Sequence, residues 1–342
     1  MVHIDLTQND LSADGLVVVT GAGGFIGGHL VRKLRSVGVP VRAVDLKPLT
    51  EWYQLFDDVD NLQRDLKLRE HCDEIVQGAA RVYNLAADMG GMGFIENNKA
   101  LCMLSVLINT HMLEASVSAG VQRYFFSSSA CVYAAHKQLN VDNPGLAEAD
   151  AYPAMPEDGY GWEKLFSERM CRHFTEDFGL VTRVARYHNV YGPWGTYDGG
   201  REKAPAAICR KVIEASLSGS GEIEIWGDGQ QTRSFTYIDD CIEGTLRIAA
   251  CDVTEPLNLG SDEMVSINEL VDIVEDIAGV RLKRLYRLDA PLGVRGRSSD
   301  NSLISRRLGW APAFTLRDGL EITFRWIFDE MRSGIKASAL AN

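Results

Sequence analysis

The chain has 342 residues, of which 46% are hydrophobic and 24% charged, a composition that excludes an intrinsically disordered protein. Its net charge of −12 argues against nucleic acid as a partner, since that binding needs a basic surface. No apolar run approaches the ~18 residues of a membrane-spanning helix, and residues 1–15 lack a signal-peptide pattern, so no membrane contact and a cytoplasmic location are predicted. The seven cysteines are odd in number and never closely paired, which indicates neither disulfides nor a metal site.

Strands and helices are predicted to alternate along the first half of the chain. Leu16–Thr20 is wholly apolar and is followed by glycines, which is typical of a strand buried on both faces of a parallel sheet. A helical pattern covers Ile26–Val37, and Val39–Asp45 is a second predicted strand. The repetition of this order predicts an α/β fold with a doubly wound parallel sheet. Its further elements are strands at 81–86, 123–128 and 182–187 and helices at 95–119 and 162–178.

The regular alternation of strands and helices ends at about residue 190, and residues 192–200 are rich in Gly, Pro, Trp and Tyr. We therefore predict a Rossmann domain over 1–190 and a smaller mixed α/β domain over 191–342, with 236–260 returning to the first domain. No low-complexity linker separates the two domains, so a cleft between them is expected. The elements predicted in the second domain are short strands at 223–229 and 231–237, around a Gly-Asp-Gly turn, and helices at 267–278 and 316–331.

Three glycines at three-residue spacing, Gly21, Gly24 and Gly27, lie between the first predicted strand and the first predicted helix. Glycine lets the backbone turn tightly and lets its amides approach a pyrophosphate, which the helix start at Phe25 and Ile26 also attracts. A glycine turn without a ligand is the alternative. Because the strand, the helix and a downstream acid agree, the pattern favours a dinucleotide site.

The downstream acid is Asp45, at the end of the second predicted strand. A carboxylate there accepts hydrogen bonds from the adenosine ribose and repels a 2′-phosphate, which favours NAD over NADP. Arg42 and Lys47 lie close by and weaken that preference slightly, and a solvated turn aspartate is the alternative. Asp65 is harder to interpret from the sequence, because it could simply cap a helix.

Tyr160 and Lys164 are four residues apart in a predicted helical segment, which places the phenol and the ammonium group on one face. A cation beside a phenol lowers the pKa of the phenol from about 10, which makes it a general base for an alcohol proton while hydride leaves for a nicotinamide. Taken alone, such a pair is usually solvated. When it follows a dinucleotide-binding fold in the chain, it is far better evidence of a catalytic site.

A serine-rich segment, residues 125–133, follows the strand predicted at 123–128. If the chain stays extended past the sheet edge, Ser129, Cys131 and Tyr133 point the same way. Ligands of open α/β sheets bind at this edge, so Ser129 and Cys131 are candidates for sugar contacts. A packed thiol is the alternative for Cys131.

These features together resemble the extended short-chain dehydrogenase/reductase superfamily, which includes nucleotide-sugar epimerases and dehydratases. They are the glycine motif, residues 84–87 (NLAA), the serine run, and Tyr160 with Lys164. From about residue 16 to about residue 327 the chain is similar, more narrowly, to the family of GDP-mannose 3,5-epimerases. The segments that carry this resemblance are 86–94 (AADMGGMGF), 128–131 (SSAC), 200–206 (GREKAPA), 226–229 (WGDG), 231–235 (QTRSF), 260–266 (GSDEMVS) and 294–297 (VRGR).

The narrower resemblance implies an NAD-dependent isomerase whose substrate is a GDP-sugar, GDP-mannose, and whose product is GDP-L-galactose, with GDP-L-gulose as a further candidate. The sugar is oxidised transiently at C4. The ketone acidifies the hydrogens at C3 and C5, because the carbanion becomes an enolate, and re-reduction leaves no net redox change. The family's base and acid match Cys131 and Lys203.

The resemblance also implies which residues hold the ligands. Cofactor contacts are implied for Asp65, Leu66 and Ala86, in addition to the glycine loop, Asp45 and the Tyr160–Lys164 pair. Arg201 and Arg297 are further cations available to the pyrophosphate, although a lone arginine is often only a surface ion pair. The substrate contacts implied are Gly90, Ser129, Cys131, Asn189, Glu202, Lys203, Ala204, Lys211, Gln231, Arg233 and Arg295.

Three other functions stay open on the sequence. A C4-epimerase would have the same fold and cofactor without proton exchange at C3 and C5, and dehydratase relatives carry Glu at the position of Cys131. A non-catalytic NAD-sensing scaffold would be expected to lose the Tyr160–Lys164 pair. Relatives also imply a homodimer through helices 95–119 and 162–178, although packing on the sheet explains their apolar faces equally well.

Overall fold

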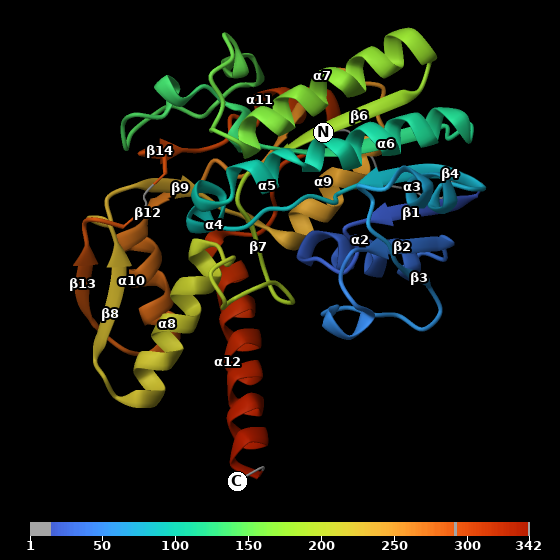
Figure 1. The fold of residues 1–342 in the computed structure, drawn as a ribbon. Helices are drawn as coiled ribbons and strands as arrows, with labels where there is room; N and C mark the ends of the chain where they lie inside the picture. The colour runs from blue at the N-terminus through green and yellow to red at the C-terminus, as the bar shows by residue number, and fades with distance from the viewer. Residues whose placement is uncertain (1–14, 291–292, 341–342) are drawn as a thin grey trace.

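The centre of the computed structural model, which describes residues 15–290 and 293–340, is a seven-stranded parallel sheet (Figure 1). Its strands are β1 (Leu16–Thr20), β2 (Val41–Asp45), β3 (Asp60–Gln63), β4 (Ala79–Asn84), β5 (Arg123–Ser129), β6 (Val181–Tyr187) and β11 (Leu257–Leu259). Their order is β11-β6-β5-β4-β1-β2-β3, and every neighbouring pair is parallel. The chain therefore starts mid-sheet and builds outward on both sides, which confirms the predicted doubly wound Rossmann sheet.

Side chains alternate along the strands into two apolar cores, one on each face of the sheet. The helices over these faces are α2 (Phe25–Ser36), α3 (Arg69–Ile75), α6 (Ser105–Ser118), α7 (Tyr160–Phe178) and α9 (Ile238–Ala250). Phe125 of β5 packs in the core of α2 and α9, while its neighbours Tyr124 and Phe126 pack with α3, α6 and α7. This double burial explains why the central strands are continuous apolar runs.

The single helix predicted over 95–119 is divided into α4 (Met92–Asn97), α5 (Lys99–Met103) and α6. The break falls at Asn98, whose ψ is 40° and whose side-chain amide donates to the carbonyl oxygen of Phe94 at 2.9 Å. Residues 99–118 are long and apolar enough to cross a membrane by length and composition alone, so the expectation that no segment qualifies is wrong. The 18-residue window of this stretch that qualifies is 44% buried inside the molecule, and the absence of membrane contact stays a prediction.

The second region contains small sheets that combine distant segments. β8 (Glu222–Trp226) pairs with β13 (Lys283–Arg287), and β9 (Thr232–Ser234) pairs with β12 (Met264–Ser266) and β14 (Gly296–Arg297). The two strands predicted around the Gly-Asp-Gly turn therefore exist but belong to different sheets. Each of them pairs with a strand from later in the chain, and the pattern of residues in the sequence does not show which strands pair.

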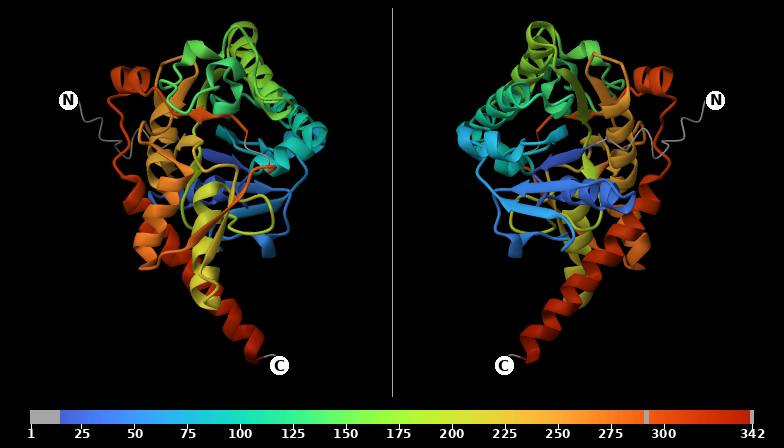
Figure 2. Two further views of the ribbon diagram at one scale, coloured as in Figure 1. Left: turned by 90° about the vertical axis from the view of Figure 1, so that its left-hand side faces the viewer. Right: turned by 90° about the vertical axis from the view of Figure 1, so that its right-hand side faces the viewer.

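The helices of the second region are α8 (Ala204–Ser218), α10 (Ile267–Ala278), α11 (Ser302–Leu308) and α12 (Leu316–Leu340). α12 packs against α8 and α10 and then extends away from the body of the molecule (Figure 2). Residues 238–259 return to the large sheet as α9 and β11. The short elements are η1 (Leu49–Glu51), η2 (Ala130–Val132), η3 (Ala135–Lys137), η4 (Glu148–Ala151), β7 (Val190–Tyr191) and β10 (Thr236–Tyr237). The segment used to predict the absence of a signal peptide lies almost wholly within residues 1–14, outside the described residues.

Two buried histidines are held uncharged by the fold. His188 follows β6, its Nε2 lies 3.0 Å from Asn258 Oδ1, and burial lowers the pKa of His188 to about 3. Burial likewise lowers the pKa of His29 to about 4. The unfolded chain binds these protons near pH 6.5, so this stabilisation is complete above pH 6.5 and is lost as the pH falls toward about 4 and below.

We predict that the free energy of unfolding in urea is lower at about pH 5 than at about pH 7 by about 2 kcal/mol for each of these histidines. His188→Gln should remove one histidine's share of this pH dependence. A free energy of unfolding that is equal at the two pH values would contradict the prediction.

Candidate active site

The glycine loop lies at the carboxyl end of β1 and leads directly into α2. Gly21 has a φ of +69°, in the left-handed region that glycine enters without steric cost. A Cβ at Gly27 would lie 2.1 Å from the carbonyl oxygen of Gly21, and one at Gly24 would lie 3.1 Å from the same atom. Phe25 and Ile26 open α2, and no described side chain caps that end. The first N–H groups of the helix are therefore available to a ligand.

Asp45 lies at the end of β2, beside this loop. Its Oδ2 accepts a hydrogen bond from the Gly23 amide at 3.0 Å, and its Oδ1 accepts one from the Lys47 amide at 3.0 Å. Burial raises the pKa of the Asp45 carboxyl group, while the two backbone donors act to lower it. Asp45 therefore holds the loop in place and lies where a ribose diol of a dinucleotide would bind.

The other predicted cofactor residues lie at the same edge of the sheet. Asp65 and Leu66 follow β3, and Ala86 follows β4. The amide of Ala86 donates to Thr20 Oγ1 at 3.2 Å, which ties the ends of β1 and β4 together. The strand order reverses between β1 and β4, which is where open α/β sheets bind dinucleotides. The glycine-rich loop and the free helix start fit the pyrophosphate of NAD, and Asp45 fits its ribose.

Tyr160 and Lys164 form the first turn of α7, and both are buried. Lys164 Nζ lies 5.6 Å from the centre of the Tyr160 ring but 3.7 Å from Glu163 Oε2. Burial raises the pKa of Tyr160, and the neighbouring Cys131 and Glu163 raise it further. The predicted lowering of the phenol's pKa is therefore wrong for this structure, because burial dominates and Glu163 balances the ammonium charge.

Cys131 lies in the 3₁₀ turn η2 rather than in an extended chain. The turn follows β5 directly, and the Cys131 amide donates to Ser129 Oγ at 3.2 Å. The alternation predicted for Ser129, Cys131 and Tyr133 is therefore broken. Tyr133 is fully buried in a separate apolar cluster, where its hydroxyl bonds to Asn258, so it does not belong to the site.

The Cys131 sulfur lies between apolar and charged neighbours. It shares a buried cluster with Tyr160 and Cys102. On its other side, Arg297 Nη1 lies 3.6 Å from Sγ. Burial and the charge of Glu157 raise the pKa of Cys131 to about 11, while Arg297 acts to lower it. At neutral pH the group is therefore mainly a thiol.

Lys203 approaches the same place from the second region. It is the N-cap residue of α8, between Glu202 and Ala204, and it is half-buried. Burial lowers the pKa of the Lys203 ammonium group, and the charges of Cys131 and Glu157 act to raise it. Lys203 therefore lies within electrostatic range of the thiol, although 72 positions separate the two residues in the sequence.

The segment from 88 to 94 joins the two regions beside Lys203. The Gly91 amide donates to the carbonyl oxygen of Arg201 at 3.0 Å, and a Cβ at Gly91 would lie 2.5 Å from the carbonyl oxygen of Glu202. The Arg201 guanidinium group stacks over the Phe94 ring at 3.8 Å. Gly90, a predicted substrate contact, is buried at this junction.

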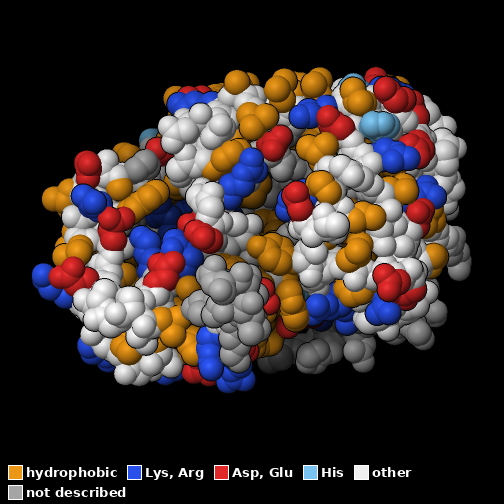
Figure 3. Space-filling view, turned by 60° about the horizontal axis from the view of Figure 1, so that its bottom comes forward, with side chains coloured by type: hydrophobic (Ala, Val, Ile, Leu, Met, Phe, Trp, Pro, Cys, Tyr) orange, Lys and Arg blue, Asp and Glu red, His pale blue; other side chains and the backbone are white. Residues whose placement is uncertain are grey.

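Arg233 also lies near the Cys131 cluster. It is in register with Arg297 on the neighbouring strand, and the charges of Glu157 and Cys131 act on its guanidinium group. Figure 3 shows Lys and Arg side chains gathered around a hollow in one face, in a protein whose net charge is −12. The other four predicted substrate residues form hydrogen bonds with neighbouring groups of the second region. Asn189 Nδ2 donates to the Ser234 carbonyl oxygen at 3.0 Å, and Lys211 Nζ donates to the Glu224 carbonyl oxygen at 3.0 Å. Gln231 Nε2 donates to the Trp226 carbonyl oxygen at 2.9 Å, and Arg295 donates to both Asp228 carboxylate oxygens at 2.8 and 2.9 Å.

Arg297 requires a correction. The sequence placed it among the cations available to a pyrophosphate, but it is 5% exposed and lies against the thiol. Gln138 and Glu157, which hold its guanidinium group, were missed altogether. No local pattern links these positions, because they come together only where β14 pairs with β9 and lies against the segment that carries Gln138.

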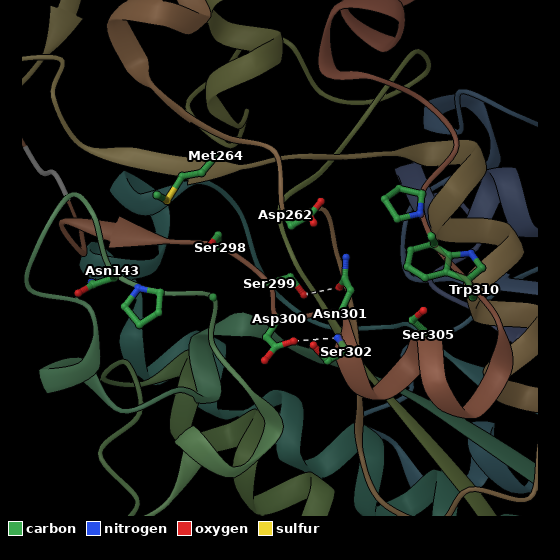
Figure 4. Close-up of a pocket in the computed structure, with 14 residues that line it drawn as sticks. Asn143, Asp262, Met264, Ser298, Ser299, Asp300, Asn301, Ser302, Ser305 and Trp310 are labelled. Atoms are coloured by element: carbon green, nitrogen blue, oxygen red, sulfur yellow. Dashed lines mark hydrogen bonds between the residues drawn. The ribbon is translucent and has the colours of Figure 1, made fainter.

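A pocket of about 710 Å³ lies beside the chain that follows β14 (Figure 4). Its polar groups bond to one another: Ser299 Oγ donates to Asn301 Oδ1, and the Ser302 amide donates to Asp300 Oδ1. None of the predicted site residues lines it. The residues that do are Asn143, Pro144, Gly145, Asp262, Met264, Ser298, Ser299, Asp300, Asn301, Ser302, Ser305, Trp310, Ala311 and Pro312.

The glycine loop with Asp45 and the buried Tyr160–Lys164 pair are typical of few protein families. Residues 17–260 match the model of the NAD dependent epimerase/dehydratase family. The chain belongs to that family. This family member is 48% identical over 319 residues to GDP-mannose 3,5-epimerase of Arabidopsis thaliana, a match that covers 92% of this chain and 82% of the plant protein.

Solved structures of epimerases have the same architecture as this family member. UDP-glucose 4-epimerase of Thermotoga maritima, solved with UDP-glucose, matches with a TM-score of 0.83 at 25% identity, over 92% of this chain and 99% of that one. UDP-glucuronic acid 4-epimerase of Bacillus cereus, in complex with UDP-glucuronic acid and NAD, matches with a TM-score of 0.77 at 26% identity, over 91% and 98%. The family and its neighbours confirm NAD as the cofactor.

Proposed function

We propose that this chain is a GDP-mannose 3,5-epimerase that forms GDP-L-galactose, with GDP-L-gulose formed by inversion at C5 alone. One observation supports the proposal: Cys131 and Tyr160 share a buried cluster, and Lys203, from a third segment, lies within electrostatic range of Cys131. A C4-epimerase needs the phenol but has no use for a further thiol and amine. The 48% identity to the plant enzyme supports the same substrate.

The chemistry follows from the acidity of the sugar. When bound, NAD supplies the acceptor for the C4 hydride and later returns it. A carbonyl group at C4 acidifies the neighbouring C–H bonds, because the carbanion is stabilised as an enolate. Tyr160 holds the proton of the C4 hydroxyl. The Cys131 thiolate takes a ring proton from one face, forming S–H, and the Lys203 ammonium group gives a proton to the other face.

The test is incubation of the holoenzyme with GDP-mannose in heavy water, followed by NMR of the recovered sugar. Deuterium is expected at both C3 and C5. Exchange at neither carbon, with inversion only at C4 of a UDP-sugar, would favour the C4-epimerase instead.

We also propose a homodimer, in the cytoplasm. α5, α6 and α7 pack side by side (Figure 1), and apolar side chains on them and on the turn between α5 and α6 are 37–56% exposed, whereas Ile108 of α6 and Leu165 of α7 are buried. The exposed side chains are Met103, Leu104, Leu107, Trp162 and Phe166. The seven free cysteines fit a reducing compartment. Light scattering should show a dimer that Phe166→Glu converts to a monomer.

A further inference from the structure

A buried guanidinium group lies against the sulfur of the proposed base. Arg297, on β14, places Nη1 3.6 Å from Cys131 Sγ. Its Nη2 donates to Glu157 Oε2 at 3.3 Å, and its Nε donates to Gln138 Oε1 at 2.5 Å. The side chain of Arg297 is 6% exposed and that of Glu157 is 15% exposed, so this charge pair is largely removed from water. Each nitrogen of the guanidinium group therefore has a protein partner, and one of those partners is the reacting atom.

The backbone fixes this arrangement. The amide of Arg295 donates to the Gln138 carbonyl oxygen at 3.0 Å, and a Cβ at Gly296 would lie 2.2 Å from the carbonyl oxygen of Asn140. β14 is therefore held tightly against the 138–140 segment. Because that segment also carries the Gln138 side chain, Arg297 cannot leave the sulfur without breaking several bonds.

The charged and titratable groups around Cys131 are Cys102 in α5, Glu157 before α7, Tyr160 in α7, Lys203 at the start of α8, Arg233 on β9 and Arg297 on β14. Only Glu157 among them carries a negative charge at neutral pH. A guanidinium group stays protonated at every pH at which proteins fold, whereas the lysine and the tyrosine can exchange protons. Arg297 is therefore a permanent source of positive charge, and its Nη1 lies 3.6 Å from the sulfur.

We propose that Arg297 is a further catalytic residue, whose guanidinium group stabilises Cys131 as the thiolate that takes the ring proton. Gln138 is a positioning residue that holds the guanidinium group at the sulfur, whereas the Glu157 carboxylate offsets part of its charge. The S–H proton leaves to solvent when the thiolate forms. The thiolate electron pair then takes the ring hydrogen as a proton, and the electrons of the C–H bond stay on the sugar as the enolate. The removal of the ring proton by Cys131 depends on the proposed function, whereas the stabilisation of the thiolate by Arg297 does not.

The first test needs no sugar. The holoenzyme is treated with iodoacetamide over a range of pH, and the alkylation of Cys131 is followed by the mass of its peptide. Arg297→Gln should raise the thiol's pKa by about 1 or more, which slows alkylation about tenfold at a fixed, mildly alkaline pH. Glu157→Gln should lower the pKa and speed alkylation. The matched control is Arg307→Gln, an exposed arginine of α11, which should leave the rate unchanged.

The opposite signs separate this role from a structural one, since general loosening of the site would speed alkylation in both variants. Equal alkylation of Arg297→Gln and the wild type overturns the proposal. If Arg297→Gln does not fold, Arg297→Lys and Glu157→Gln decide the matter. Arg297→Lys keeps a positive charge on a shorter side chain, so its thiol pKa should lie slightly above that of the wild type. If Glu157→Gln leaves the thiol pKa unchanged or raises it, the proposal is overturned.

A second test separates this inference from the proposed function. With GDP-mannose in heavy water, Arg297→Gln should slow exchange about 100-fold, with partial recovery at higher pH. If the wild type itself shows no exchange, the proposed function fails and the alkylation experiment still decides the role of Arg297. If the wild type and Arg297→Gln exchange at equal rates, the function stands and this inference is overturned.

Discussion

Cys131→Ala is expected to slow deuterium exchange into GDP-mannose by about 1,000-fold, because a positioned general base contributes on the order of 100- to 10,000-fold. The methyl group that replaces the thiol can neither take nor return a ring proton. Binding of NAD should not change, because the glycine loop and Asp45 lie on other segments. The measurement is NMR of the recovered sugar, together with a titration of NAD binding.

Lys203→Met should give a different pattern. The sulfur can still remove a proton and return a deuteron to the same face, so exchange with retention is expected to outlast inversion at that carbon. Cys171→Ala is the matched control for Cys131→Ala, since this buried cysteine of α7 belongs to a different apolar cluster from Cys131. Normal exchange in Cys131→Ala, or full inversion in Lys203→Met, would show that these residues are not the acid–base pair.

Elements with a strong local pattern could be predicted from the sequence. β1 is wholly apolar and runs into glycines, and the predicted strand has the same bounds as the observed one. α10 was also predicted at its observed bounds from its helical spacing, and the structure adds a capping box of Ser266 with Glu269 at its start. In such segments the local signal and the global fold agree.

The rest of the fold depends on pairings between distant segments. β13 and β14 are short and were missed, because their partners β8 and β9 lie more than 50 residues away. The same is true of the site. The sequence indicated Cys131 as a candidate base but could not show that Arg297, Glu157 and Gln138 surround it, since β14 brings them together. The direction of the shift in the pKa of Tyr160 also depends on burial, which the i, i+4 spacing does not report.

A buried ion pair joins β6 and α7 near Ser129, and removing one of its partners should destabilise the Rossmann domain strongly. Arg186 of β6 and Glu168 of α7 are 2% and 3% exposed and meet through two hydrogen bonds of 2.9 and 2.7 Å. Arg186 also donates to the Glu148 carbonyl oxygen at 2.7 Å, and Ser128 Oγ donates to Glu168 at 2.5 Å. Burial by itself lowers the pKa of Arg186, but the Glu168 carboxylate outweighs it and raises the pKa. The pair therefore links β6 to α7, and through Ser128, the residue before Ser129, it also links both to β5.

Glu168→Gln should lower the free energy of unfolding by about 3–5 kcal/mol, because it leaves the Arg186 guanidinium group buried without its counter-charge. Glu176→Gln is a matched control in the same helix, since its partner Arg172 is 62% exposed and such pairs contribute at most about 1 kcal/mol. Urea unfolding followed by circular dichroism measures both. Equal losses in the two variants would mean that the buried pair contributes no more than a surface one. Because Ser128 bonds to Glu168 and precedes Ser129, Glu168→Gln should also slow turnover, whereas Glu176→Gln should not.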